Sequence, residues 1–357
     1  MNTRVQFGTL LVGVTSIDTP MAPEEDVSQL PIPSWMQPSG WFQVGWSAEI
    51  APGDMLTAKC FGRDLIVYRT ESGELNCMDA RCLHLGAHLG KGGKVVGDCV
   101  VCPFHGWSWA PDGTNREIPD TTEVNRSKHI PTRPVYERNG VIYIWNDAQG
   151  RAPSWVVPDI FTELDDGDPC GPFHEPFPNA IGRYPHLTIQ PRITVENIVD
   201  PAHVRYVHGA KRIPTIIDHE ITPHTFRTQL RVPSRGRVAS VSTDKPDTVT
   251  LMAWGVGVSL TRFAGRDNGF GIFAATPEDA EYCTLFQTIW VEAHPGESDE
   301  SLAARRTAML TTYTEDHPIW ENQEFLDVPG LISTEAKLFG AVRKWCRTFE
   351  PVDEHNA

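Results

Sequence analysis

The chain has 357 residues, 40% of them apolar and 22% charged, which is enough for a substantial core in one large or two ordinary domains. Its formal charge of −15 disfavours binding to nucleic acid or to an acidic membrane surface, so we expect small molecules and proteins as partners. The eight cysteines are sparse for this length and no secretory signal is recognisable, which favours a cytoplasmic protein with reduced thiols over a disulfide framework.

The N-terminal third of the chain predicts an arm followed by a small all-β domain. The apolar stretch at residues 7–14 is too short to span a membrane and lacks a small-x-small cleavage site, so we interpret residues 1–36 as an arm. No other stretch approaches spanning length, and we expect no membrane span. Residues 37–150 contain short alternating runs separated by turn residues, which predict an all-β domain. Residues 147–180 are rich in proline, glycine and aspartate and predict a linker or a wrapping segment.

Within the predicted β domain, four potential metal ligands form two short motifs, each with one thiol and one imidazole. The motifs are Cys82-x-His84 and Cys102-x-x-His105. Each motif can hold a metal through both of its side chains. Residues 90–98 contain several glycines, which permit a hairpin that brings the two motifs face to face. His88 and Cys99 lie outside the pattern, and we interpret them as a loop residue and a buried small side chain.

The mixed pairing points to an iron–sulfur cluster. Zinc-finger ligands usually come as a pair of cysteines followed by a pair of histidines, so a zinc-binding structural protein is the weaker alternative. A Rieske [2Fe–2S] centre is held by two thiolates on one iron and two imidazoles on the other, and a mixed pair on each loop suits it. The stretch "CLHLGAHLG…CPFHGWSW" resembles the Rieske motif of the ring-hydroxylating oxygenase family.

A second group of polar residues stands at 196–208, "ENIVDPAHVRYVH". It has the pattern Asn197, Asp200, His203, His208. On a regular helix, five steps of about 100° place the two histidines roughly 140° apart, so they converge only if a turn is widened or the helix ends between them. A proline directly after Asp200 indicates a break there. Two histidines supply two of the three ligands of a 2-His-1-carboxylate iron site. The alternative is that Asp200 only caps a helix and the histidines are surface groups.

The C-terminal part predicts an antiparallel sheet with helices. The β-like runs are residues 248–263, 269–277 and 282–293. We consider residues 251–260 and 269–275 as pocket lining or ordinary sheet core. Near the end, a helical stripe is expected from Leu338, Val342, Trp345 and Phe349. We therefore predict an α+β fold, with residues 151–357 forming the second domain.

The family resemblance implies further residues and an assembly. It implies a helix-grip-like catalytic domain in which His203, His208 and a downstream acid bind Fe(II). The acid falls in "TEDHPIWENQEFLD"; we choose Asp316, with Glu315 and Asp327 as rivals. The resemblance also implies a homotrimer in which Asp200 links His105 of one subunit to His203 or His208 of the next, with Asn197 close to the iron. A carboxylate between two metal-bound imidazoles would fix both ring tautomers.

The function implied is that of the terminal oxygenase component of a Rieske monooxygenase. The Asn-x-x-Asp spacing and "DHPIWEN" resemble the oxygenase component of 3-ketosteroid 9α-hydroxylase, which implies an apolar, steroid-like or polycyclic substrate and O₂. We find no nucleotide-binding fingerprint, so electrons are expected from a ferredoxin or flavin reductase. Basic residues flank the cluster motifs and could steer such a partner: Arg81, Lys91, Lys94 and Arg116. The alternatives are an O- or N-demethylase, an aromatic ring dioxygenase, and an electron-transfer protein without oxygenase activity.

Overall fold

The computed structural model describes residues 32–167, 170–233, 247–265 and 268–351. The predicted arm therefore lies outside the described residues up to residue 31. The strands are Gly40–Trp46 (β1), Met55–Cys60 (β2), Arg63–Arg69 (β3), Leu75–Asp79 (β4), Lys94–Val96 (β5), Cys99–Val101 (β6), Ser108–Trp109 (β7), Asn115–Glu117 (β8), Val135–Arg138 (β9), Val141–Asn146 (β10), Ile181–Leu187 (β11), Thr215–Ile221 (β12), Thr225–Val232 (β13), Asp247–Trp254 (β14), Val258–Ala264 (β15), Gly269–Pro277 (β16) and Cys283–Val291 (β17). The helices are Ile160–Glu163 (α1), Pro191–Glu196 (α2), Pro201–Tyr206 (α3), Asp299–Thr314 (α4), His317–Trp320 (α5) and Ala336–Arg347 (α6), with 3-10 turns at Ser34–Met36 (η2), Ser47–Glu49 (η3) and Asn197–Val199 (η4).

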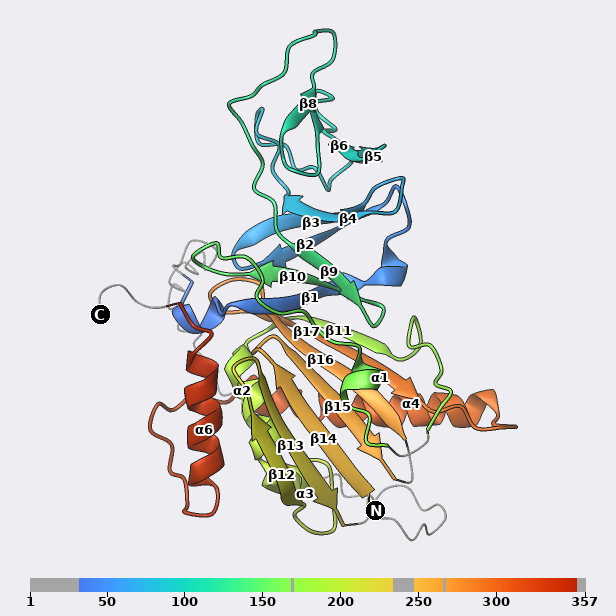
Figure 1. Ribbon diagram of the computed structural model, residues 1–357, viewed down its shortest axis with the longest axis vertical. Helices are drawn as coiled ribbons and strands as arrows, with labels where there is room; N and C mark the ends of the chain where they lie inside the picture. Colours follow the sequence, from blue (N-terminus) through green and yellow to red (C-terminus); the bar gives the residue numbers. More distant parts are fainter. Residues whose placement is uncertain (1–31, 168–169, 234–246, 266–267, 352–357) are drawn as a thin grey trace, which may run out of the picture.

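Three small sheets are stacked above one large sheet (Figure 1). The small sheets have the orders β1-β10-β9, β2-β3-β4 and β5-β6-β7-β8, and the last forms the tip of the molecule. The large sheet has seven strands in the order β11-β17-β16-β15-β14-β13-β12, all paired antiparallel. The predicted α+β class with a β-rich N-terminal part is confirmed. The predicted division at residue 150 stays a prediction.

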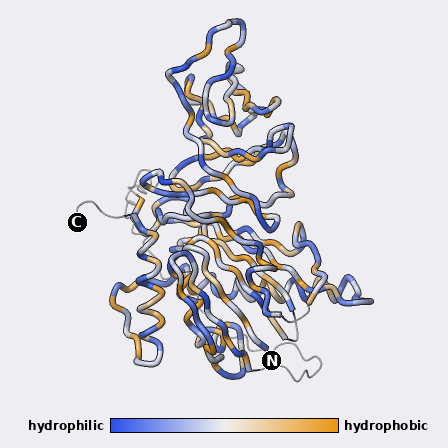
Figure 2. Tube along the Cα trace, in the orientation of Figure 1, coloured by the Kyte–Doolittle hydropathy of each residue, from blue (hydrophilic) through white to orange (hydrophobic). Residues whose placement is uncertain are grey.

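The seven-stranded sheet is covered on both faces. Side chains alternate between the faces along each strand. On one face, Leu260 and Ile272 pack with Trp41 and Trp46 of β1. On the other face, the strands carry apolar residues that pack under α2, α4 and α5. The hydropathy along the chain follows this layering, with apolar stretches on the strands and polar stretches in many of the loops (Figure 2).

One predicted strand is two strands. The run 248–263 was interpreted as a single β-like segment, but β14 and β15 form a hairpin in which Trp254 pairs with Val258. The chain reverses at Gly255, whose φ of +60° favours glycine. The apolar alternation continues on both sides of this turn and therefore conceals it.

The predicted stripe of the last helix is buried where several parts of the chain meet. Val342, Trp345 and Phe349 lie in a cluster with Phe42 of β1 and Phe226 of β13, and Leu338 packs against it. The Trp345 indole also donates a hydrogen bond to the Thr222 carbonyl at 2.9 Å. The helix prediction is confirmed. The apolar face of α6 joins the N-terminal sheets to the large sheet.

Segment 147–180, predicted as a linker or wrapping segment, packs through its described residues against one face of the large sheet. Trp155, Val157 and Ile160 pack in the core beside Trp41. The Trp41 indole donates to the Trp155 carbonyl at 2.6 Å. These contacts hold the segment against β1 and the face of the large sheet.

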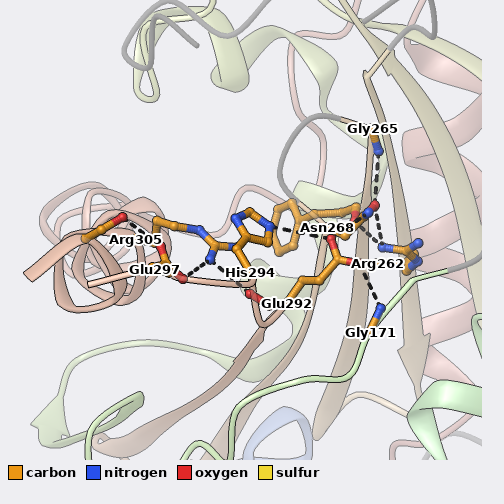
Figure 3. A network of polar contacts seen from close by, with 10 residues as sticks. Gly171, Arg262, Gly265, Asn268, Glu292, His294, Glu297 and Arg305 are labelled. Carbon is orange, nitrogen blue, oxygen red and sulfur yellow. Dashed lines mark hydrogen bonds and ion pairs between the residues drawn. The ribbon is translucent and has the colours of Figure 1, made fainter. Parts of the chain in front are cut away.

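A polar network ties the far end of that sheet to α4 (Figure 3). Glu292 accepts hydrogen bonds from Gly171 N and from Asn268 Nδ2. Arg305 of α4 donates to the Glu292 carbonyl, while buried Arg262 donates to Asn268. The network fixes the start of α4, the helix that leads to the predicted acidic ligand.

Direct contacts join the second small sheet to the turn between β16 and β17. Lys59 Nζ lies 2.5 Å from Asp279 Oδ2, and Phe61 N donates to the Pro277 carbonyl. Among the helices in the described part of the chain, none has the length and hydropathy needed to cross a membrane.

Candidate functional site

The two Cys/His motifs form loops with the same backbone hydrogen bonds. Cys82 N donates to the Ala87 carbonyl and Gly86 N to the Cys82 carbonyl. In the second loop, the same offsets relate the Cys102 N–H to the Trp107 carbonyl and the Gly106 N–H to the Cys102 carbonyl. The glycine four residues after each cysteine has a positive φ, +81° and +71°, which closes the loop. The β5–β6 hairpin lies between the loops, so the predicted hairpin is confirmed.

The side chains of these loops suit a cluster that is buried on its sulfur side. Cys82 and Cys102 are buried and interact with each other, while His84 is half-buried and His105 is exposed. The two imidazole rings have centroids 4.8 Å apart. Two buried thiols facing two outward imidazoles are the donor set that a Rieske [2Fe–2S] centre needs.

Two tryptophans beside these loops were not predicted. The Trp109 indole donates to Cys82 Sγ at 3.3 Å, a hydrogen bond that suits a thiolate. Trp107 stacks on His84 with centroids 4.4 Å apart. The sequence signal was available in "CPFHGWSW", where both indoles follow the second motif within the same turn and strand.

The four polar residues at 197–208 lie on an interrupted helix. Helix α2 ends at Glu196 and is followed directly by the 3-10 turn η4, which ends at Val199. Asp200 comes next, and α3 begins at Pro201. Asp200 Oδ1 accepts hydrogen bonds from Ala202 N at 2.8 Å and from His203 N at 3.3 Å, so it caps α3. The predicted break after Asp200 is confirmed.

His203 and His208 approach each other because α3 ends between them. The helix stops at Tyr206, and the chain turns before His208. The two rings have centroids 5.2 Å apart. The sequence left two ways for the histidines to converge, a widened turn or a helix that ends between them. The structure has the helix end.

A buried carboxylate completes the group. Ligand atoms of His203, His208 and Asp316 all lie within 4.8 Å of one another. Asp316 is only 6% exposed and lies between α4 and α5, with Oδ2 at 3.4 Å from His208 Nε2. Two imidazoles and one carboxylate form the donor set of a non-haem Fe(II) site.

The two rival acids occupy different places. Glu315 Oε2 lies 3.1 Å from Nδ1 of His208, on the side of the ring away from Asp316. Asp327 is exposed in the loop before α6. Glu315 is therefore placed to accept a hydrogen bond from Nδ1–H of the imidazole, a role that the sequence did not distinguish from direct metal binding.

The two histidines have opposite shifts in pKa. Burial lowers the pKa of His203, outweighing the neighbouring carboxylates Asp316 and Asp200. Burial also opposes the charged form of His208, but Asp316 and Glu315 outweigh it and raise the pKa of His208. The lowered pKa favours the neutral form of His203, which is the form that binds a metal, whereas the raised pKa of His208 favours its charged form, which must lose a proton before it binds one.

Asn197 and Asp200 both precede the break, but they face different partners. Asp200 Oδ2 is 3.7 Å from His203 Nδ1, an atom with no hydrogen-bond partner among the described residues. Asn197 Oδ1 accepts a hydrogen bond from the Trp320 indole at 3.4 Å. The structure brings Asp200 to His203, and it links Asn197 to the helix that follows Asp316.

The two candidate sites lie far apart in one chain. The loops beside β5 and β6 are at the tip of the molecule, and α3 is near the opposite end (Figure 1). No side chain of one site contacts the other among the interactions of the described residues.

Comparison with protein families covers both parts of the chain. Residues 40–131 match the Rieske [2Fe–2S] domain, and residues 144–349 match the 3-ketosteroid 9alpha-hydroxylase C-terminal domain. The second match covers more than half of the chain.

The chain is similar to two kinds of curated protein, among others. A probable 3-ketosteroid-9-alpha-monooxygenase oxygenase component from Rhodococcus rhodochrous is 28% identical over 328 residues, covering 87% of this chain and 79% of the relative. The cholesterol 7-desaturase nvd of Bombyx mori is 42% identical over 132 residues, which are 37% of this chain and only 28% of that protein.

Solved structures agree on the fold. Dicamba monooxygenase bound to dicamba aligns with a TM-score of 0.68 at 18% identity, over 88% of this chain and 97% of that one. NdmA of Pseudomonas putida CBB5 with caffeine aligns with a TM-score of 0.64 at 19% identity, over 86% and 89%. With both donor sets in place and both domains matched, the chain belongs to the Rieske oxygenases with a 3-ketosteroid 9alpha-hydroxylase C-terminal domain, oxidoreductases whose cofactors are a [2Fe–2S] cluster and a non-haem iron.

Proposed function

We propose that this chain is the terminal oxygenase component of a multicomponent monooxygenase that hydroxylates an apolar, steroid-like substrate. The observation that carries the proposal is the convergence of His203, His208 and Asp316 in a chain that also has a complete Rieske donor set. An electron carrier would have no use for the second group of ligands.

In this proposal Cys82, His84, Cys102 and His105 hold the cluster, and His203, His208 and Asp316 hold the iron. When bound, the cluster supplies one-electron transfer and the iron supplies activation of O₂ at its open coordination positions. Glu315 lies at Nδ1 of His208 at 3.1 Å and Asp200 faces Nδ1 of His203 at 3.7 Å, so neither acid is counted among the three residues that would hold the iron.

The chain's own polar groups orient these ligands. In the tautomer with a proton on Nδ1, His208 donates a hydrogen bond to Glu315, which leaves Nε2 free to bind on the side of Asp316. Asp200 faces Nδ1 of His203, and about a third of its side chain is exposed, so a group from outside the chain can reach it. Asn197 accepts a hydrogen bond from the Trp320 indole, and this contact positions α5, the short helix after Asp316.

Electron delivery is proposed to occur between subunits of a homotrimer. The separation of the two sites within one chain supports this, because transfer between them requires a second copy (Figure 1). Apolar side chains are exposed at both ends: Leu85 and Phe104 beside the cluster ligands, and Tyr206 and Ile213 beside the iron ligands. Contact between these two surfaces would place His105 of one copy beside Asp200 of the next.

A separate ferredoxin or reductase is proposed to supply the electrons. Of the basic residues flanking the cluster, Arg81 is paired with Asp64 at 2.7 Å. Lys91, Lys94 and Arg116 are exposed and remain candidates for steering an acidic partner.

The proposed substrate class rests on the relatives and on the sheet. Both kinds of curated protein are named for a steroid or a sterol. The strand face below the iron ligands carries Phe273, Leu285 and Ile289, which suits an apolar molecule.

The test combines metal analysis with product analysis on the full chain. Wild type should contain acid-labile sulfide and a reduced Rieske EPR signal, while a His203→Ala, His208→Ala double variant should lose about one iron per chain with unchanged sulfide. With an electron donor and cholest-4-en-3-one, wild type should yield a product 16 mass units heavier. A product two mass units lighter than the substrate would indicate desaturation instead. Release of formaldehyde from a methyl-ether or N-methyl substrate would indicate demethylation. Equal iron content in wild type and the double variant would contradict the iron site and indicate an electron carrier.

A further inference from the structure

One fully buried amide on the catalytic sheet has no partner. Gln287, on β17, is 0% exposed, and neither its Nε2 nor its Oε1 has a hydrogen-bond partner among the described residues. A buried amide without partners costs free energy, so such groups are usually paired. The amide therefore offers its N–H donors and its carbonyl acceptor to a group that the described residues do not provide.

The position of Gln287 in the strand places it on the face below the iron ligands. It shares that face with Leu285 and Ile289, because side chains alternate along a strand. Leu285 packs with Trp320, four residues after Asp316, and Ile289 packs with Tyr313, three residues before it. Gln287 thus lies between the two apolar clusters that flank Asp316.

Its cross-strand neighbours connect it to the iron site. Gln287 pairs with Phe273 of β16 on one side and with Gly182 of β11 on the other. The Phe273 ring packs on Trp320 at 5.5 Å, and the Trp320 indole donates to Asn197. The packed rings of Phe273 and Trp320 therefore connect the neighbourhood of Gln287 to α5, the helix that follows Asp316.

The part of this face that β15, β16 and β17 form carries no charged side chain among the described residues. On this face β15 carries Ser259, Thr261 and Phe263, β16 carries Gly269, Gly271, Phe273 and Ala275, and β17 carries Cys283, Leu285, Gln287, Ile289 and Val291. None of these residues is ionisable except for the Cys283 thiol, whose pKa burial raises well above its usual range. The buried arginine of β15, Arg262, points to the opposite face with Phe270. A ligand in contact with these three strands meets an apolar, uncharged surface apart from Gln287, while the ionisable groups Tyr184 and His317 lie beside it.

We propose that Gln287 is the polar anchor of the substrate site: its amide hydrogen-bonds an uncharged oxygen, a carbonyl or a hydroxyl, on an otherwise apolar substrate. A carbonyl accepts from Nε2, and a hydroxyl can also donate to Oε1. The inference rests on the proposed function and narrows it, since it requires a steroid-like molecule with an oxygen away from the reacting carbon.

The test measures binding of three matched probes to the full iron-loaded chain by quenching of tryptophan fluorescence. The probes are cholest-4-en-3-one, cholesterol and cholestane, which carry a carbonyl, a hydroxyl and no oxygen. Wild type should bind the first two about tenfold or more tightly than cholestane, and Gln287→Leu should abolish that preference while leaving cholestane binding unchanged. Gln287→Met provides a second variant of similar length should the leucine variant fold poorly.

Gln43, equally buried but on β1, supplies the matched control, because Gln43→Leu should retain the preference for oxygenated probes. Suppose that wild type prefers the oxygenated probes and that both Gln287 variants fold and keep this preference. The proposal that Gln287 is the anchor is then wrong, while the proposed function stands. If wild type binds none of the probes, the steroid assignment fails and the anchor falls with it.

Discussion

Replacing Glu315 separates the role of an orienting residue from that of a metal ligand. Glu315 Oε2 lies 3.1 Å from His208 Nδ1, while Asp316 Oδ2 lies 3.4 Å from Nε2 of the same ring. If this geometry persists with iron bound, Glu315 fixes the ring and its tautomer, and Asp316 binds the metal. Glu315→Ala should weaken iron binding without abolishing it.

The magnitude follows from the hydrogen bond that is lost. A hydrogen bond to a charged group contributes about 1.5–3 kcal/mol, and Glu315 keeps 22% of its side chain exposed, which favours the lower end. The expected loss of iron affinity is therefore on the order of tenfold, within the range of 10–100-fold typical of residues that orient a ligand. Glu315→Gln retains an acceptor oxygen and should lose about threefold.

The assay is competition for Fe(II) with a chelator, followed by iron and sulfide analysis of the same samples. Asp316→Ala should lose the mononuclear iron entirely, and Asp327→Ala, an exposed acid in the following loop, should resemble wild type. Sulfide content reports on the distant cluster and should not change in any variant. Retention of iron by Asp316→Ala together with its complete loss from Glu315→Ala would refute the reasoning and make Glu315 the ligand.

Three further predictions concern the cluster, the contact between sheets and the core. Trp109→Phe removes the hydrogen bond to Cys82 Sγ and should lower the reduction potential of the cluster by roughly tens of millivolts, measured by redox titration with the EPR signal retained. Burial opposes ionisation of Asp279, but the hydrogen bond from Lys59 outweighs it and lowers the pKa of Asp279, so the stabilisation is present above the unfolded pKa of about 3.9 and is lost as the pH falls through the folded value. Asp279→Asn should therefore cost about 1 kcal/mol at pH 7, a figure kept small because Lys59 is 38% exposed, and the difference from wild type in urea unfolding should vanish in strong acid. Trp345→Ala should cost about 3–5 kcal/mol in the same assay, because the indole fills a buried cluster and donates to a carbonyl, and a loss under 1 kcal/mol would contradict the core assignment.

The features that the sequence predicted well are local. The two cluster motifs, the hairpin between them and the break after Asp200 depend on glycines, a proline and short spacings that act within a few residues. The missed hairpin at Gly255 shows the limit of this approach, because an apolar alternation continues through a tight turn without any change in period.

The third ligand could not be fixed from the sequence for a physical reason. Residue 315 lies 107 positions from His208, and no periodicity relates points that only the fold brings together. Adjacent acids at the end of a helix point in different directions, so Glu315 and Asp316 reach opposite nitrogens of one ring. The sequence could identify the group of acids, but the choice within it depends on the direction in which α4 ends.

Asp200 shows how two interpretations that compete at the level of sequence can hold together in the structure. A helix cap and a link to a histidine were alternatives, because each gives the side chain a complete role. The carboxylate has two oxygens: Oδ1 accepts from Ala202 N and His203 N, and Oδ2 is directed toward His203 Nδ1 at 3.7 Å. Capping holds the side chain in one rotamer, so the second oxygen is kept beside His203 while the side chain remains partly open to solvent. The proposed bridge to a neighbouring subunit therefore uses the cap as its support, and removing the carboxylate with Asp200→Ala would weaken α3 and the bridge together.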